Sequence, residues 1–126
     1  MPPSTPNSTG SASPSAIPYG QWNSFPRQPF PMYEGTKAII YRSADGKLAI
    51  GTLHEKGKDT LTWPVDEFLF VTEGWITMDV EGGERFTLTK GDVMVMRKGQ
   101  VITFEASEDF ANVAVFWDEG GRVELV

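Results

Sequence analysis

The fold is decided by a stretch between residues 66 and 99, which reads DEFLFVTEGWITMDVEGGERFTLTKGDVMVMRKG. It consists of short runs rich in Val, Ile, Phe, Trp and Thr, which are the residues enriched in β-strands. Glycines separate these runs at intervals that suit tight turns. No window repeats its apolar residues with helical spacing over three turns. The stretch therefore predicts consecutive strands joined by turns.

The same pattern continues on both sides of this stretch. Runs of strand length occupy residues 37–41, 47–54, 68–72, 75–80, 93–96, 101–106 and 112–117. Many short strands with regular turn signals are typical of a β-sandwich or barrel. We therefore predict one all-β domain over residues 36–126, with the polar segment Lys56–Asp59 as a solvated loop.

The N-terminal part of the chain has a different composition. Residues 1–16 are rich in Pro, Ser and Thr and contain no aromatic or charged side chain, which predicts a disordered tail. Residues 17–35 alternate aromatic side chains with prolines, so regular structure is disfavoured while burial is favoured. This segment is predicted to be an extended arm lying across a folded body, either its own or that of a partner.

Composition excludes several classes of protein. The chain has no cysteine and one histidine, His54, which excludes disulfide frameworks, zinc fingers and sites that need two imidazoles. Its net charge of −6 and its scattered basic residues argue against a nucleic-acid partner. It has no apolar run of membrane-spanning length and no basic leader followed by an apolar stretch. We therefore expect a cytoplasmic protein with no membrane partner.

One run needs cover on both of its faces. Residues 68–71, Phe-Leu-Phe-Val, are apolar at every position, whereas the following run, 75–80, alternates. A small barrel covers only the inner face of such a strand. The outer face must be covered by the arm, by another sheet or by a second subunit, and we predict a homodimer.

Two blocks of the chain resemble the cupin superfamily. In the first, Glu67 is followed seven residues later by Gly74, and the second opens with Gly91-Asp92 and closes with Gly99. The likeness extends over about residues 36–118 and is closest to the small cupins of the ureidoglycolate and ethanolamine-utilisation type. It implies a jelly-roll β-barrel, also called a double-stranded β-helix.

The departures from the cupin pattern concern its metal ligands. Metal-binding cupins carry His-x-His shortly before the glutamate, and those positions here are either Leu61 and Trp63 or Thr60 and Thr62. A later ligand histidine corresponds to Ile102. Only the glutamate is retained, so the resemblance implies that the metal site is lost. We expect no metal and no other cofactor.

The resemblance also implies an apolar cavity with one carboxyl group. Glu67 would point into the barrel, and desolvation would raise its pKa toward neutrality. The expected substrate-binding residues are Trp63 or its neighbour Thr62 at the mouth, with Leu69, Ile102 and Phe104 inside.

Two residues are the catalytic candidates. Glu67 is the proposed acid or base, and the alternative is a structural ion pair with Arg97 or Lys98 or a bond to a hydroxyl. His54 is the proposed assisting base, and the alternative is a rim histidine satisfied by a backbone group or water.

These residues favour a metal-independent enzyme that uses acid–base chemistry on a small, partly apolar molecule, as an isomerase, cyclase, dehydratase or lyase. One alternative is a non-catalytic cupin module that binds a small molecule or forms oligomers. Another is a divalent-metal oxygenase. A cavity of roughly 300 Å³ or more around the glutamate favours ligand chemistry, whereas a filled core favours a structural role.

Overall fold

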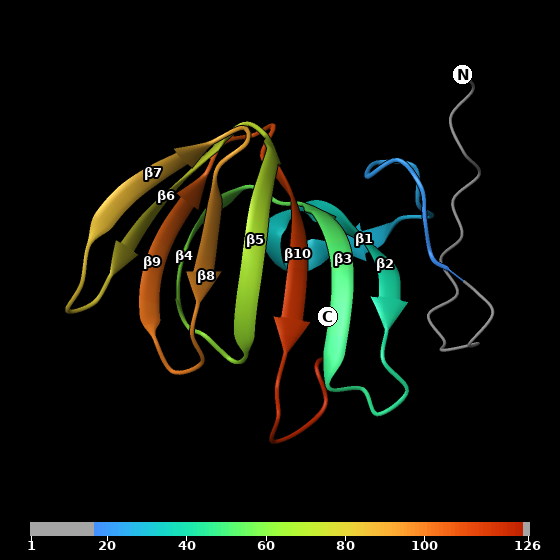
Figure 1. Ribbon diagram of the computed structural model, residues 1–126. Coiled ribbons are helices and arrows are strands. Elements are labelled where there is room, and N and C mark those ends of the chain that lie inside the picture. The colour runs from blue at the N-terminus through green and yellow to red at the C-terminus, as the bar shows by residue number, and fades with distance from the viewer. Residues whose placement is uncertain (1–16, 125–126) are drawn as a thin grey trace.

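The structure is a computed structural model that describes residues 17–124. Its strands form two antiparallel sheets that pack face to face (Figure 1), which confirms the predicted all-β, jelly-roll class. The six-stranded sheet has the order β1-β2-β3-β10-β5-β8, and the four-stranded sheet has the order β4-β9-β6-β7. No pairing joins the two sheets among the described residues, so the jelly roll is a flattened sandwich.

The elements follow one another closely along the chain. The larger sheet contains β1 (Gln28–Phe30), β2 (Gly35–Arg42), β3 (Leu48–His54), β5 (Asp66–Glu73), β8 (Val93–Met96) and β10 (Ala111–Trp117). The smaller sheet contains β4 (Gly57–Thr62), β6 (Trp75–Val80), β7 (Arg85–Thr89) and β9 (Val101–Ala106). A short 3-10 helix, η1 (Pro31–Tyr33), follows β1. No helix in this part of the chain is long and apolar enough to cross a membrane.

The loop predicted at Lys56–Asp59 is wrong, because β4 begins at Gly57 and pairs with β9 along its whole length. β4 is an edge strand, and five of its six residues are exposed. An edge strand with solvent on its outer face needs little apolar sequence, so its pattern resembles that of a loop.

The arm lies on the sheet of its own chain. β1 pairs with β2, and the Arg27 guanidinium donates hydrogen bonds to Thr36 Oγ1 at 2.6 Å and to Thr52 Oγ1 at 3.0 Å. Phe25 and Phe30 are buried. Strand structure therefore begins inside the segment predicted to be an extended arm. The tail predicted at residues 1–16 lies outside the described residues.

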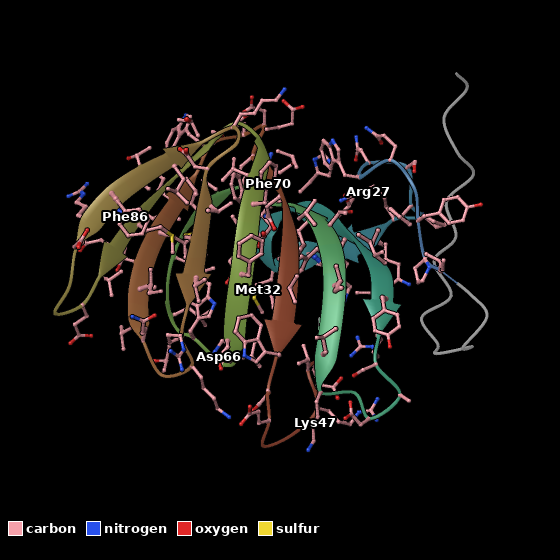
Figure 2. The ribbon with its side chains drawn as sticks, in the orientation of Figure 1. Arg27, Met32, Lys47, Asp66, Phe70 and Phe86 are labelled. Carbon is pink, nitrogen blue, oxygen red and sulfur yellow. The ribbon has the colours of Figure 1, made fainter. Side chains whose placement is uncertain are left out.

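An apolar surface remains on the outer face of the larger sheet. On β5, Leu69 and Val71 are buried, whereas Phe70 points to the other face and is 39% exposed. The neighbouring β8 side chains Val93 and Val95 are more than half exposed. The contacts of Arg27 lie on β2 and β3, across β10 from this surface (Figure 2). The arm therefore leaves Phe70 uncovered, and the homodimer stays a prediction.

We expect Phe70→Asp to weaken self-association by about tenfold or more, because a charge would be buried at the centre of an apolar interface. Thr87→Asp is the matched control, since Thr87 is exposed on β7 of the other sheet. Sedimentation velocity over a concentration series measures both variants. A wild-type protein that stays monomeric at about 100 μM, far above the Kd of a stable dimer, would contradict the prediction.

Candidate functional site

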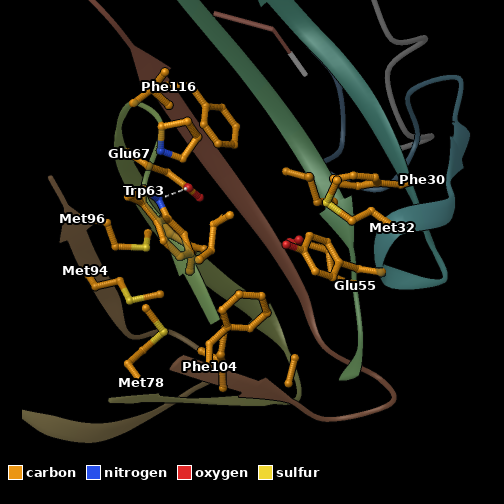
Figure 3. A pocket seen from close by; sticks show the side chains of 18 of the residues that line it. Phe30, Met32, Glu55, Trp63, Glu67, Met78, Met94, Met96, Phe104 and Phe116 are labelled. Atoms are coloured by element: carbon orange, nitrogen blue, oxygen red, sulfur yellow. Dashed lines mark hydrogen bonds between the residues drawn. The ribbon is translucent and has the colours of Figure 1, made fainter. Parts of the chain in front are cut away.

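A cavity of about 400 Å³ lies between the two sheets (Figure 3). Both sheets and the arm contribute apolar side chains to its wall, including Phe30, Met32, Tyr33, Leu53, Leu69, Ile76, Met78, Met94, Met96, Phe104 and Phe116. Its volume exceeds the threshold that separates a ligand site from a filled core. The interior is therefore large enough for a small organic molecule.

Glu67 lies in this apolar wall. It sits on β5, is 6% exposed, and its Oε1 accepts a hydrogen bond from the Trp63 indole N–H at 3.0 Å. Burial raises its pKa to about 8, the negative charge of Glu55 adds to the rise, and the Trp63 hydrogen bond opposes it. Glu67 is therefore largely protonated at neutral pH and holds a proton that it can donate.

A second carboxyl group, Glu55, faces the cavity from a different side (Figure 3). It follows β3, and its Oε1 accepts a hydrogen bond at 3.0 Å from the side-chain amide of Asn112, a fully buried residue of β10. Burial raises its pKa, and the Asn112 hydrogen bond opposes the rise. We did not predict this residue, although side chains alternate along a strand and Glu55 therefore shares a face with the buried Leu53.

The two carboxyl groups form an electrically coupled pair. The charge of Glu55 raises the pKa of Glu67, so the proton on one group depends on the charge of the other. Neither group makes an ion pair with a residue that the structure describes. A pair of this kind can hold one proton and leave one carboxylate free, which provides an acid and a base in a single cavity.

The structure does not bring His54 to Glu67. His54 lies on the opposite face of β3 and is not part of the cavity wall. Its Nε2 donates to Asn23 Oδ1 of the arm at 2.8 Å, and its ring centroid lies 5.8 Å from that of Trp22. Burial and the nearby charge of Arg27 lower its pKa. These contacts indicate that His54 holds the arm against the sheet. Its hydrogen-bond partner is the side-chain amide of Asn23, rather than the backbone group or water that the sequence-based alternative named.

The predicted substrate-binding residues divide into two groups. Trp63, Leu69 and Phe104 line the cavity. Ile102 is buried in the core but is not part of the cavity wall, and Thr62 is exposed on β4.

The basic residues considered as partners of Glu67 are engaged elsewhere. Arg97 forms an ion pair with Asp66 at 3.2 Å, and Lys98 forms one with Asp118 at 3.1 Å. Both side chains are more than half exposed. The structural alternative of an ion pair with Arg97 or Lys98 therefore has no support in the geometry around Glu67.

Comparison with known sequences places this arrangement in a family. A model of the EutQ-like cupin domain matches residues 42–113, more than half of the chain. The chain belongs to the EutQ-like cupin family. The match confirms the resemblance to small cupins of the ethanolamine-utilisation type. No curated protein sequence matches this cupin significantly.

Several solved protein structures show the same fold at low sequence identity. EutQ from Salmonella typhimurium LT2 is 23% identical with a TM-score of 0.67, over 93% of this chain and 96% of that one. KdgF from Halomonas sp. is 18% identical with a TM-score of 0.59, over 73% and 86% of the two chains. The structure of FeII HppE is 18% identical with a TM-score of 0.65, over 89% and 65%. These likenesses show the fold alone.

The residues of this cupin do not fit a resident divalent metal. Of the two alignments left open by the sequence, Leu61 and Trp63 face the cavity, whereas Thr60 bonds to Thr103 on the exposed side. Neither Leu61, Trp63 nor the buried Ile102 has a side chain that ligates metals. Among the described residues, no group of three or more His, Cys, Asp or Glu side chains is close enough to hold an ion.

Trp63→Phe tests the hydrogen bond inside the cavity. The indole N–H stabilises the ionised form of Glu67, so its removal is expected to raise the pKa of Glu67 further above its ordinary value. A phenylalanine keeps most of the aromatic surface against Phe104. Carboxyl-carbon NMR titration of both proteins measures the change. An unchanged or lower pKa in the variant would contradict the assigned hydrogen bond.

Proposed function

We propose that this cupin is a metal-independent enzyme that uses acid–base chemistry on a small, partly apolar organic molecule bound between its sheets. The observation that carries the proposal is the buried Glu67 carboxyl, which faces an apolar cavity of about 400 Å³ and has a pKa near 8. A group with a pKa close to neutrality is suited to both donating and accepting protons.

The two carboxyl groups take complementary roles in this proposal. Glu67 enters the reaction protonated and donates its proton to the substrate. Glu55, whose negative charge helps to keep the proton on Glu67, accepts a proton from another atom of the substrate. The substrate gains one proton and loses another, so isomerisation, cyclisation, dehydration or elimination needs no oxidant and no added group.

The cavity wall supports these transfers by holding the substrate in a dry environment. Trp63 stands against Glu67 and fixes its orientation through the indole N–H. Phe104 lies edge-on to Trp63, with ring centroids 5.9 Å apart, and offers a surface for an apolar part of the substrate. Exclusion of water strengthens the electrostatic contribution of both carboxyl groups.

The metal-independent form of the mechanism follows from the residues that face the cavity. The positions that hold histidine ligands in metal-binding cupins are apolar or indole side chains here. Of the four carboxyl groups in the wall, Asp118 and Glu124 form ion pairs with Lys98 and Arg122, which leaves Glu55 and Glu67. In this proposal the enzyme works in the cytoplasm as a homodimer, as the sequence predicts.

Activity profiling on a small-molecule extract tests the proposal. Protein dialysed against EDTA is incubated with the extract, and mass spectrometry follows compounds that are consumed and formed. We expect a product with the mass of its substrate, or lighter by water or another eliminated fragment. Glu67→Gln should lower the turnover rate by about 100-fold or more, because general acid–base catalysis contributes that much.

Glu105→Gln is the matched control, because Glu105 is an exposed glutamate on β9 that does not line the cavity. This variant should keep wild-type turnover. Full turnover by Glu67→Gln, or activity that requires an added divalent ion, would refute the proposed mechanism. A compound that is bound and recovered unchanged would favour the non-catalytic binding module instead.

A further inference from the structure

The inner part of the cavity carries acidic groups without a basic partner. In the part of the chain that the structure describes, Glu55 and Glu67 accept side-chain hydrogen bonds only from neutral groups, the Asn112 amide and the Trp63 indole. Arg122 is the one basic residue among the described residues that line the cavity, and it is exposed and lies 3.8 Å from Glu124. Of the four carboxyl groups that line the cavity, Asp118 and Glu124 are paired with Lys98 and Arg122, and Glu55 and Glu67 are without a basic partner among the described residues.

Aromatic rings connect the surroundings of the two carboxyl groups. Phe30 and Tyr33 meet edge-to-face with centroids 5.5 Å apart, and Tyr33 meets Phe104 in the same way at 5.5 Å. Phe104 in turn meets Trp63, which bonds Glu67. Aromatic faces carry negative potential and attract cations, most strongly where water is excluded. Lys37 Nζ already lies over Phe30, 5.7 Å from its centroid, so it is the other rings and the two carboxyl groups that favour a positively charged ligand.

Other ligand charges fit this cavity less well. An anion would face two carboxyl groups and the negative faces of the rings in a region of low dielectric constant. A neutral molecule would leave any carboxylate charge in the cavity uncompensated, which is costly for a buried group. A cationic group compensates that charge and can donate a charge-assisted hydrogen bond to a carboxylate in the cavity.

We propose that the ligand of this cavity carries a protonated amine joined to an apolar or aromatic portion, with the ammonium group between Glu55 and Glu67. This inference rests on the proposed function, because it names the class of molecule that enters the same cavity. The apolar portion lies against Phe104 and against Met78 and Met94, whose thioether side chains adapt to varied shapes.

Amine binding has a consequence for the proton on Glu67. A positive charge beside the carboxyl group favours its ionised form and lowers its pKa, so binding releases a fraction of a proton from Glu67 to the solvent. Glu67 acts as the acid in the complexes that retain the proton. Calorimetry in buffers of different ionisation enthalpy measures the number of protons released.

Three probes of nearly equal size test the inference on the full chain: 2-phenylethylamine, 2-phenylethanol and phenylacetate. We expect the amine to bind about tenfold or more tightly than the alcohol, and phenylacetate to bind most weakly. Amine binding at pH 7 should release protons, whereas alcohol binding should not. Calorimetry and ligand-observed NMR give the affinities.

Charge-neutral variants locate the effect. Glu55→Gln and Glu67→Gln should each reduce the ratio of amine to alcohol affinity, and Glu67→Gln should also abolish proton release. Glu105→Gln should change neither quantity, since its side chain is exposed outside the cavity. Circular dichroism verifies that every variant is folded, and the ratio of two affinities within one variant corrects for a general loss of binding.

Each outcome bears on one of the two proposals. Equal affinity for amine and alcohol, an unchanged ratio in both cavity variants, or no amine binding would overturn the cationic-ligand inference. The enzyme proposal depends on the turnover of Glu67→Gln and survives those results if that variant is inactive. Conversely, a strong amine preference with full turnover by Glu67→Gln would refute the enzyme mechanism and support the ligand class.

Discussion

Replacing Glu67 by glutamine is expected to make the protein more stable at pH 8 and to leave its stability near pH 4 almost unchanged. Glutamine has the shape of the protonated carboxyl group and keeps an oxygen to accept the Trp63 N–H. It removes the cost of ionising a buried acid. The variant should therefore exceed the wild type in free energy of unfolding wherever the wild-type glutamate is forced to ionise.

The direction of this pH dependence follows from the number of protons that the folded and unfolded states bind. The carboxyl group titrates near its ordinary pKa of 4.5 in the unfolded chain and near 8 in the folded protein. Between these values the folded state binds more protons, so its stability falls as the pH rises, by about 1.4 kcal/mol per pH unit. The stabilisation that comes from protonated Glu67 is complete at pH values below its unfolded-state pKa and is lost at pH values above its folded-state pKa. The variant should gain roughly 3–5 kcal/mol at pH 8.

Urea unfolding of both proteins at several pH values measures this difference. Glu105→Gln, which changes an exposed glutamate, should show no such gain at pH 8. A Glu67→Gln protein that is less stable than the wild type at pH 8 would mean that the carboxylate is satisfied in the folded state. That result would remove the physical basis for its acid role.

The second large effect concerns Gly74, the single residue that connects β5 in the larger sheet to β6 in the smaller one. Gly74 has φ +70°, and a Cβ atom placed on it would lie 2.3 Å from Ser107 Oγ and 2.9 Å from Phe110 Cα. Ser107 Oγ accepts the backbone N–H of Trp75 and donates to Asp109, so the hydroxyl is already fixed in place. We expect Gly74→Ala to lower the free energy of unfolding by about 3 kcal/mol or more.

Gly82→Ala separates the steric effect from backbone strain. Gly82 has a similar φ of +75°, but a Cβ atom placed on it would meet no atom of the described residues within 4 Å. Its substitution should cost only about 1–2 kcal/mol, the cost of a left-handed backbone alone. Thermal unfolding monitored by circular dichroism compares the two. Equal losses in both variants would show that the contact with Ser107 carries no extra cost.

Local patterns were sufficient to predict most strands. β6, β8 and β9 have the bounds expected from the sequence, because their apolar residues alternate or run together between glycine turns. β4 and β7, the two edge strands of the smaller sheet, were missed because an exposed edge strand needs few apolar residues. β1 was missed because its pairing with β2 stabilises a proline-containing segment that has little strand propensity of its own.

The site was predicted less completely. Whether a side chain faces the cavity depends on its position along the strand, and not on how rare the residue type is in the chain. His54 attracted attention as the single histidine, yet side chains alternate along β3 and it faces the arm. Its neighbour Glu55 faces the cavity for the same reason. Glu67 and Trp63 were predicted through the family resemblance, and the cavity brings them together with Phe104.

Other features depend on contacts between distant parts of the chain. The volume of the cavity is set by how closely side chains from two sheets approach, and no local sequence window records that distance. The Asn112 side-chain amide donates a hydrogen bond to Glu55, which lies 57 positions earlier in the sequence. Likewise, Arg27 reaches Thr52 only because β1 brings the arm alongside the larger sheet.

The arm also helps to enclose the interior. Met32 and Tyr33 form part of the cavity wall, yet they belong to a segment fastened by β1, an edge strand of three residues. Short edge elements open locally at lower free energy than central strands. A bound molecule that contacts Tyr33 would in turn slow hydrogen exchange of the β1–β2 amides, because occupancy favours the closed segment.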